Sequence, residues 1–385
     1  MAQPIKVETA GVRRRRLSGL GVAFADAERA DNNLSLLRLA AAFAVLFAHS
    51  WPVVEGAGAQ DPVTRALSAA LDQPVALSGL AVHAFFVISG YLVTKSALTR
   101  RSPLQFAAAR VLRIYPALLV HVLIVALFIG PLITGIPVAQ YFLDARFSEF
   151  VANNALMWNA TYELPGVFEE RLSKAVNASL WTLPVEIRCY LAIGLLLAAG
   201  LLRSWTVAAL LVVLGVLSMF APELRALGEA NAASNIFYFM FGALVFLFRE
   251  KVPANGVFSL GLLLAGAAAF RAGSGPLLVG AGLGLSVLWA GLIAPKLFDS
   301  ARWLGDPSYG VYLWAYPIQQ IVVETTHVVD PWAVTAIAGV LTLAAGVLSW
   351  RLVERRALAK ADSAALWASR GVGYVGRIVG ARLTR

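Results

Sequence analysis

Arginine and histidine side chains that could bind anions and move protons stand inside otherwise apolar stretches of this 385-residue chain. Arg38 and His49 are eleven positions apart. Eleven residues of α-helix turn through about 1100°, close to three whole turns, so both side chains lie on one face about 16 Å apart. This shared face predicts that both line one internal cavity. Taken singly, Arg38 could reach the lipid headgroups, and His49 could form an interhelical hydrogen bond.

Two further ionisable residues, His83 and Glu186, fall in other apolar stretches. Helix rise predicts that both lie near the depth of His49. A carboxylate inside a bilayer is costly unless it is paired or functional, so Glu186 is a candidate site residue. The other two histidines, His121 and His327, have no ionisable residue predicted near them at the same depth, and we expect structural roles for them.

No metal site or disulfide is expected in this chain. The four histidines show no spacing that suits a metal ion, and Cys189 is the single cysteine. The net charge of +10 would suggest a nucleic-acid partner for a soluble protein. Basic residues also crowd the cytoplasmic loops of membrane proteins, however, and we expect no nucleic-acid partner here.

The elements that position these side chains are predicted to be membrane-spanning helices. Hydrophobic residues make up 59% of the chain and charged residues 14%, well below the ~25% typical of soluble domains. About 20 apolar residues span a bilayer as a helix. The sequence therefore predicts an all-α integral membrane protein with about ten transmembrane helices. They are expected at residues 34–54, 76–97, 111–135, 181–201, 204–220, 234–249, 256–270, 276–294, 307–329 and 332–352.

Basic residues predict that both termini are cytoplasmic. With ten spans, 24 Lys and Arg residues fall on the side of the termini and six on the other side, and an excess of this sign marks the cytoplasm. The chain then divides into a basic N-terminal segment at 1–33, a ten-helix domain at 34–352 and a basic C-terminal tail at 353–385 that can rest on membrane lipids. No cleaved signal peptide is expected. The long outer connection at 136–180 suggests a lid or an acceptor surface.

Several short motifs together resemble those of the acyltransferase-3 family of bacterial membrane acyltransferases. The resemblance covers about residues 33–357 in the family's order, and the small pair Ser89-Gly90 within it also permits close helix packing. The motifs are Arg38-x10-His49, Phe85-Phe86-Val87-Ile88-Ser89-Gly90-Tyr91-Leu92, Arg113-Ile-Tyr-Pro116, Asn177 to Glu186, Ser308-Tyr309-Gly310-Val311-Tyr312-Leu313 and Trp350-Arg351-Leu352-Val353-Glu354. One departure is Ala315, which stands where many members have a histidine.

The resemblance implies a multi-pass enzyme of the bacterial inner (cytoplasmic) membrane that O-acylates a glycan or a lipid-linked saccharide. The expected donor is cytoplasmic acetyl-CoA or another acyl-CoA, and the expected products are modified surface polysaccharides such as lipopolysaccharide or exopolysaccharide. His49 is the candidate base that takes the hydroxyl proton, and Glu186 or His83 could orient it or stabilise its imidazolium. A covalent acyl-His intermediate stays open.

In the same interpretation, Arg38 with Arg110 or Arg113 could hold the phosphates of CoA at the cytoplasmic mouth. A rival hypothesis is a proton-coupled transporter or flippase of a lipid-linked sugar, in which His49, His83 and Glu186 form a proton relay. A third is a non-catalytic subunit of a polysaccharide exporter. The sequence leaves open the acceptor sugar, its hydroxyl position, the acyl length and the oligomeric state.

Overall fold

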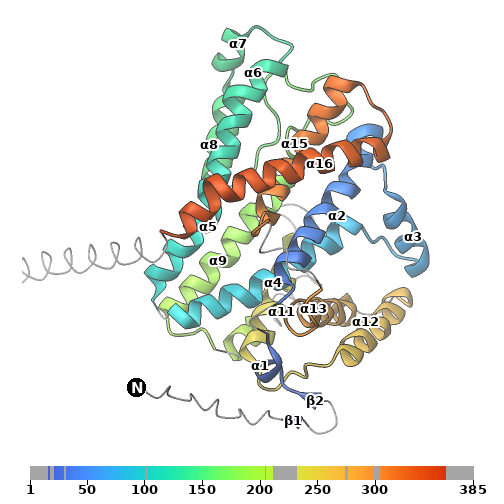
Figure 1. The fold of residues 1–385 in the computed structure, drawn as a ribbon, viewed down its shortest axis with the longest axis vertical. Coiled ribbons are helices and arrows are strands. Elements are labelled where there is room, and N and C mark those ends of the chain that lie inside the picture. Colours follow the sequence, from blue (N-terminus) through green and yellow to red (C-terminus); the bar gives the residue numbers. More distant parts are fainter. Residues whose placement is uncertain are drawn as a thin grey trace, which may run out of the picture.

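A computed structural model describes most of the chain and shows an assembly of α-helices (Figure 1). The described residues are 16–17, 21–29, 32–100, 102–203, 205–210, 232–273, 276–297 and 304–360. Within them the strands are two-residue segments, β1 (Arg16–Leu17) and β2 (Gly21–Val22), which pair antiparallel. The all-α prediction is therefore confirmed.

The long helices occupy the predicted spans. They are α2 (Leu34–Glu55), α4 (Leu77–Arg100), α5 (Pro103–Ile124), α9 (Thr182–Ala198), α11 (Ala232–Leu247), α12 (Gly256–Arg271), α13 (Pro276–Leu292), α15 (Ser308–Thr326) and α16 (Pro331–Ser349). The shorter elements are α1 (Phe24–Ala27), α3 (Pro62–Leu71), η1 (Val125–Ile129), α6 (Gly130–Ile133), α7 (Val138–Leu143), α8 (Ala145–Leu156), η2 (Ala178–Trp181), η4 (Trp350–Glu354) and α17 (Arg355–Leu358).

Five helical stretches are long and apolar enough to cross a membrane, and three shorter helices, α11, α12 and α13, are also apolar. The five are Leu34–Glu55, Leu77–Arg100, Pro103–Ile133, Ala178–Ala198 and Pro331–Leu358. The structure thus describes a membrane protein with several apolar helices. The total of ten spans stays a prediction, because most of the span expected at 204–220 lies outside the described residues.

Helix α4 packs most closely against α11. A Cβ atom at Gly90 would overlap the backbone carbonyl of Phe239, and one at Gly242 would overlap that of Val87. Glycine at both positions therefore lets the two backbones touch, as expected for small residues at membrane helix interfaces. The predicted close approach at Gly90 is confirmed, and it fixes the height of its neighbour Ser89 in the bundle.

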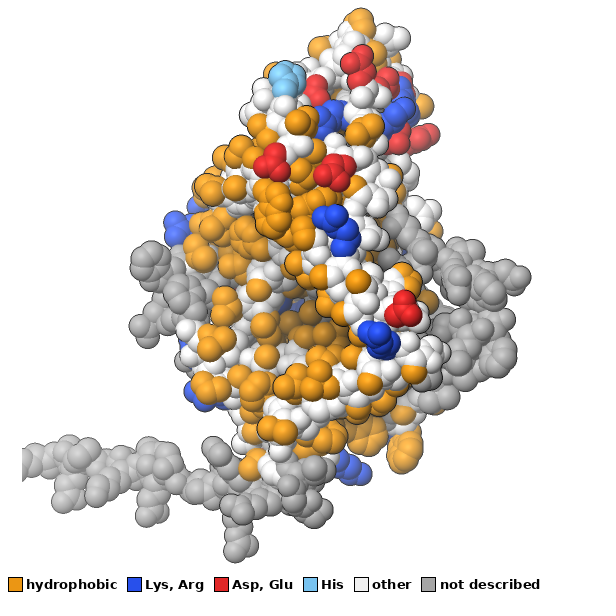
Figure 2. Space-filling model, turned by 90° about the vertical axis from the view of Figure 1, so that its right-hand side faces the viewer, with side chains coloured by type: hydrophobic (Ala, Val, Ile, Leu, Met, Phe, Trp, Pro, Cys, Tyr) orange, Lys and Arg blue, Asp and Glu red, His pale blue; other side chains and the backbone are white. Residues whose placement is uncertain are grey.

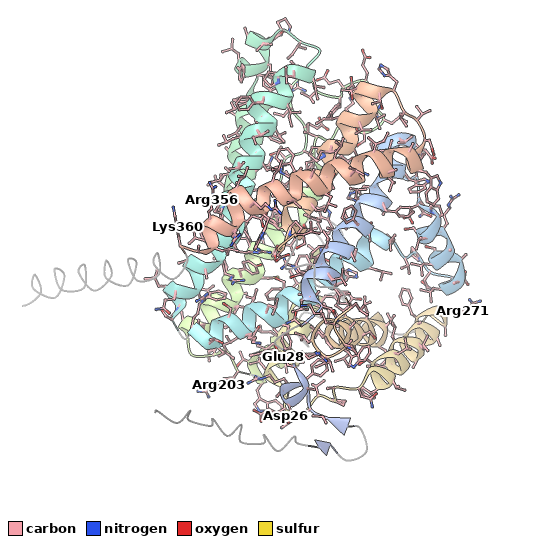
Figure 3. All side chains as sticks on the ribbon, in the orientation of Figure 1. Asp26, Glu28, Arg203, Arg271, Arg356 and Lys360 are labelled. Carbon is pink, nitrogen blue, oxygen red and sulfur yellow. The ribbon has the colours of Figure 1, made fainter. Side chains whose placement is uncertain are left out.

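Some connections that were predicted on the same side of the membrane contact one another. At the lower end, the Phe24 amide donates to the Val252 carbonyl (3.0 Å), and Lys95 pairs with Glu28 (2.5 Å). Asp26, Glu28 and Arg203 lie near this end in Figure 3. Among the connections predicted on the outer side, Arg171 donates to the Val53 carbonyl (3.0 Å) and Arg271 to that of Ala70. Which end faces the cytoplasm stays a prediction.

The surface matches a bilayer environment. Figure 2 shows a face on which hydrophobic side chains predominate, while acidic and basic side chains gather at its upper end. Large apolar side chains are exposed over many helices, among them Leu195 on α9, Leu264 on α12 and Val340 on α16. Apolar groups at such positions are stable against lipid tails.

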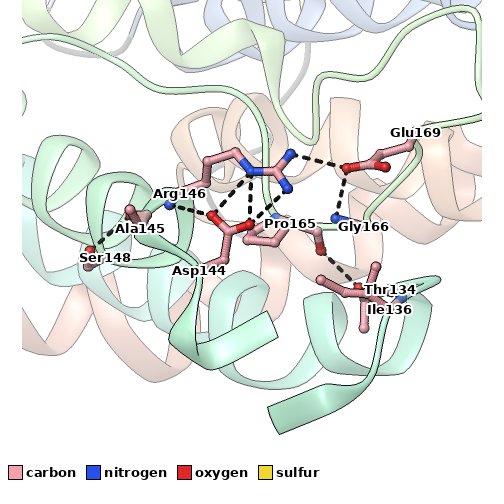
Figure 4. A network of polar contacts seen from close by, with 9 residues as sticks. All are labelled: Thr134, Ile136, Asp144, Ala145, Arg146, Ser148, Pro165, Gly166 and Glu169. Atoms are coloured by element: carbon pink, nitrogen blue, oxygen red, sulfur yellow. Dashed lines mark hydrogen bonds and ion pairs between the residues drawn. The ribbon is translucent and has the colours of Figure 1, made fainter. Parts of the chain in front are cut away.

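The outer connection 136–180 is folded and tied together by ion pairs. Arg146 binds Asp144 (2.9 Å) and Glu169 (3.1 Å), and the Gly166 amide donates to Glu169 (3.1 Å; Figure 4). Hydrogen bonds from Arg146 hold the pKa of both carboxyl groups below its usual range. The connection carries α7 and α8, so it presents a preformed outer surface.

We predict that reporter fusions will place the two ends of the bundle on opposite sides of the membrane. Alkaline phosphatase, which is active only in the periplasm, should be active when fused after Glu163. It should be inactive when fused after Lys251 or Lys360, where a fluorescent cytoplasmic reporter should work instead. Active phosphatase after Lys360 would contradict the cytoplasmic C-terminus.

Candidate active site

A cavity between five helices gathers most of the predicted site residues. Helix α9 presents Thr182, Glu186 and Tyr190 to it, which are four residues apart and therefore share one helix face. Its lining combines cationic, carboxylate, hydroxyl and apolar groups. The other lining residues are Arg38 from α2, Val82, Phe85, Phe86, Ile88, Ser89, Leu92 and Val93 from α4, Arg110, Arg113 and Ile114 from α5, Leu183 from α9, and Tyr309 and Tyr312 from α15.

Glu186 is held by two hydroxyl groups. Ser89 donates a hydrogen bond to its carboxylate (3.0 Å), and Tyr190 donates another (2.5 Å). Ser89 lies six residues, or about 9 Å of helix, from His83 along α4. Glu186 therefore meets α4 about 9 Å along the helix from His83, and the similar membrane depth of the two residues stays a prediction. The segment before α9 lies in the protein interior, since Asn177 and Ser179 are buried there.

Two arginines share one carboxylate at the lower end of the cavity. The Asp306 Oδ2 atom accepts from Arg38 (2.7 Å) and from Arg113 (2.9 Å), while Ser308 donates to Oδ1 (2.7 Å). Burial alone would raise the pKa of Asp306, but the guanidinium groups of Arg38 and Arg113 hold it well below its usual range. Asp306 is therefore ionised at neutral pH and acts as their counter-ion.

A second acid supports Arg113 from the other side. Glu354 is 1% exposed and lies 3.8 Å from the Arg113 guanidinium, and Ser349 donates to its other oxygen (3.0 Å). It belongs to the π-helical turn η4, a form that recurs at functional sites. Sequence reasoning missed Asp306 altogether and used Glu354 only as part of a motif. An acid directly before a predicted span is the signal that could have pointed to Asp306.

Arg110 faces the same cavity in a different environment. Its guanidinium lies over the rings of Tyr190 (5.6 Å) and Phe106 (5.9 Å), which attract a cation through their π-faces. Within the described ranges no carboxylate forms an ion pair with Arg110. The cavity therefore has a cationic group that an anionic ligand can neutralise.

His49 lies just behind the cavity lining. Its Nδ1 atom is 3.5 Å from the Ser179 hydroxyl, and its ring meets the edge of Tyr316 at 5.4 Å between centroids. The Ser179 carbonyl in turn accepts a hydrogen bond from Tyr312 (2.8 Å), which lines the cavity. His49 is therefore connected to the cavity wall through Ser179.

His83 contacts helix α11 and is not among the residues that line the cavity. Its ring stacks on Tyr238 of α11, with centroids 4.0 Å apart. In the part of the chain that the structure describes, no hydrogen bond joins His49 to His83 or Glu186. The structure thus brings Arg38, Arg110, Arg113 and Glu186 to one cavity, with His49 beside it and His83 further out on α4.

The two remaining histidines differ from each other. His121 is fully buried and contacts Asn177 (3.1 Å), whereas His327 is exposed and ends α15 in a left-handed conformation. No group of three or more His, Cys, Asp or Glu side chains suited to a metal ion occurs among the described residues. The groups that line the cavity can bind an anion through guanidinium groups and can transfer a proton through the Glu186 carboxylate, and the His49 imidazole lies beside it.

Comparisons with known proteins give one consistent result. A family model described as an acyltransferase domain matches residues 31–351. An "O-acetyl transferase" of Shigella phage Sf6 is 26% identical, over 86% of this chain and 97% of that protein. "Nodulation protein 10" of Rhizobium leguminosarum bv. viciae is 30% identical, over 85% and 93%. "Peptidoglycan O-acetyltransferase OatA" of Listeria monocytogenes is 26% identical, over 71% and 50%. No solved structure matches significantly.

We predict that Asp306→Asn lowers the thermal stability of the detergent-solubilised protein. The substitution keeps the shape but leaves two guanidinium groups without their shared anion, which should cost about 1–3 kcal/mol. The unfolding midpoint can be followed by size-exclusion chromatography after heating. Asp330→Asn is the matched control, because Asp330 caps α16 and asparagine caps equally well. Equal midpoints for both variants would contradict the proposed role of Asp306 as counter-ion.

Proposed function

The chain belongs to the acyltransferase-3 family, and we propose that it transfers an acyl group, in the simplest case acetyl, from acyl-CoA to a hydroxyl of a surface glycan or its lipid-linked precursor. That it is an acyltransferase follows from the family match over residues 31–351. The donor, the acceptor and a position in the bacterial inner membrane are part of the proposal. The observation that supports this proposal is the cavity that Arg38, Arg110 and Arg113 line together.

Three guanidinium groups at one end of a cavity suit the phosphates of CoA. Arginine binds phosphate through a planar fork of N–H donors, often with two hydrogen bonds at once. Arg110 lacks a carboxylate partner among the described residues, so phosphate can approach it without displacing one. Arg38 and Arg113 are already oriented by Asp306. This end is the proposed cytoplasmic mouth.

The remainder of the cavity suits the thin arm of the donor. Phe85, Phe86 and Leu92 offer apolar contacts, and the Glu186 carboxylate can accept a hydrogen bond from an amide N–H of the pantetheine arm. Thr182 and Tyr312 mark the end that adjoins Ser179 and His49. We propose that the thioester is delivered toward this end.

Acyl transfer at this end needs a base. In the proposed step the His49 Nε2 atom takes the proton of the acceptor hydroxyl, whose oxygen forms a bond to the thioester carbon. The carbon–sulfur bond then breaks, and the CoA thiolate receives the proton from the imidazolium. Glu186 is the competing candidate base, since it lines the cavity directly. His83 stacks on Tyr238 and is assigned no step.

A transporter or flippase is the alternative function, because a cavity with ionisable groups can also serve a proton-coupled carrier. We predict that inside-out membrane vesicles containing the protein will convert radiolabelled acetyl-CoA to a base-labile ester on glycan and to free CoA. Vesicles with the empty vector are the control. Transport of a lipid-linked sugar without consumption of acetyl-CoA would refute the acyltransferase proposal and favour the alternative.

We predict that His49→Asn reduces ester formation by a factor on the order of 100 or more, the usual scale for loss of a positioned general base. Asparagine can keep a hydrogen bond to Ser179 but accepts no proton at neutral pH. The measurement is ester content normalised to membrane protein abundance. His327→Asn is the matched control, since His327 is exposed and asparagine tolerates its left-handed conformation (φ 56°). Normal acylation in His49→Asn would leave Glu186 as the base, and Glu186→Gln should then be inactive.

A further inference from the structure

A series of buried polar residues, each in contact with the next, connects to His49. His121 and Asn177 are 0% exposed, and Ser179 is 1% exposed. They come from α5 and from the first residues of the segment that opens α9. Polar groups inside a membrane protein must find partners within the protein, because no water is at hand. The hydrogen bonds of these residues therefore show how each side chain is oriented.

The neighbours of Asn177 determine the orientation of its amide. The backbone N–H of Ser179 needs an acceptor, and the nearest Asn177 atom is Oδ1 at 3.1 Å. The Leu313 carbonyl needs a donor, and Asn177 Nδ2 lies 2.9 Å from it. The same Nδ2 lies 3.1 Å from His121 Nε2. His121 Nε2 must therefore be the acceptor, so His121 cannot take up a proton at that atom without losing the bond.

The backbone of Ser179 is fixed on both sides. Its N–H donates to Asn177, and its carbonyl accepts from Tyr312 (2.8 Å) and Thr182 (3.4 Å). Its hydroxyl is then left to contact His49 Nδ1 at 3.5 Å. Such a distance is common for catalytic groups before substrate binds, and it shortens in the reacting complex.

Two other buried serines donate their hydroxyl hydrogen bonds to backbone carbonyls of their own segments. Ser50 donates to the Leu46 carbonyl and Ser259 to the Asn255 carbonyl, each four residues earlier in its own segment. Ser179 stands at the start of its helix, where no such carbonyl precedes it in helical geometry. A serine at this place therefore keeps its hydroxyl free for the neighbouring helix, and His49 of α2 is that neighbour.

We propose that Ser179, held by Asn177, is a positioning residue that fixes the orientation of His49. The inference rests on the proposed function of His49 as the base. When Nδ1 carries a proton and donates it to the Ser179 oxygen, Nε2 is left unprotonated and can accept the proton of the acceptor hydroxyl. The imidazolium formed in that step keeps the same bond. If the hydroxyl is removed, the ring loses this contact and can turn away from the orientation in which Nε2 meets the acceptor hydroxyl.

The first test is Ser179→Ala in the vesicle assay with acetyl-CoA. We expect kcat to fall by about 10-fold or more, as for other groups that orient a reacting histidine, while KM for acetyl-CoA changes by less than about twofold. Ser259→Ala is the matched control, because Ser259 is equally buried but lies on α12. Unchanged kcat in Ser179→Ala would overturn the proposal.

Two further variants separate positioning from a purely structural role. Ser179→Cys nearly keeps the side-chain volume but bonds poorly to imidazole, so it should accumulate normally and lose activity as Ser179→Ala does. The double variant His49→Asn/Ser179→Ala should be no less active than His49→Asn alone, because a residue that acts through His49 has no further effect once His49 is gone. An additional loss in the double variant, or wild-type activity in Ser179→Cys, would refute the inference.

These results distinguish the inference from the proposed function. If wild-type vesicles form no ester from acetyl-CoA, both fail. If wild-type vesicles are active and His49→Asn is inactive while Ser179→Ala is normal, the acyltransferase proposal stands and the role of Ser179 is wrong.

Discussion

A bilayer offers no water to a buried guanidinium group, so the protein must supply the counter-ion from its own chain. Asp306 does this for two arginines at once, with one oxygen 2.7 Å from Arg38 and 2.9 Å from Arg113. These bonds join α2 and α5 to the segment that opens α15. Glu354 adds a second anion beside Arg113 and brings in the turn that ends α16. Four parts of the bundle are therefore held around one charge cluster, and the cavity is the space that they enclose with α4 and α9.

The same requirement explains the irregular start of α9. The chain enters the interior before the helix begins, which exposes backbone N–H and carbonyl groups to a place without water. Asn177, Thr182 and Tyr312 satisfy these groups. With this segment held inside the protein, Ser179 contacts His49 and Glu186 accepts a hydrogen bond from Ser89.

Helix periodicity predicted part of the site from sequence alone. The eleven-residue spacing placed Arg38 and His49 on one face, and the structure finds Arg38 in the cavity and His49 directly behind its wall. The start of α5 at Pro103 rather than 111 also had a local signal, since Ser102 caps the helix and proline fits its first position. The ion pair between Arg38 and Asp306, which are far apart in the sequence, had no local signal of this kind. Asp306 is 268 positions from Arg38, and periodicity within one helix says nothing about which distant loop will meet it.

Helix rise could not predict the partner of Glu186, because it says nothing about which residues of two helices meet. Ser89, the partner of Glu186, is fixed instead by the contact of Gly90 with α11. The fixed spacing of Arg38 and His49 along α2 matters for the proposed mechanism. About 16 Å of helix separates Arg38 in the charge cluster from His49 beside Ser179. Under the proposed function, a donor whose phosphates bind at the cluster must extend its acyl group along the cavity to reach His49. Because Arg38 and His49 share one helix, this distance stays constant even when neighbouring helices shift. Under the proposed function, such a geometry would favour donors with an anionic group and a long, thin arm.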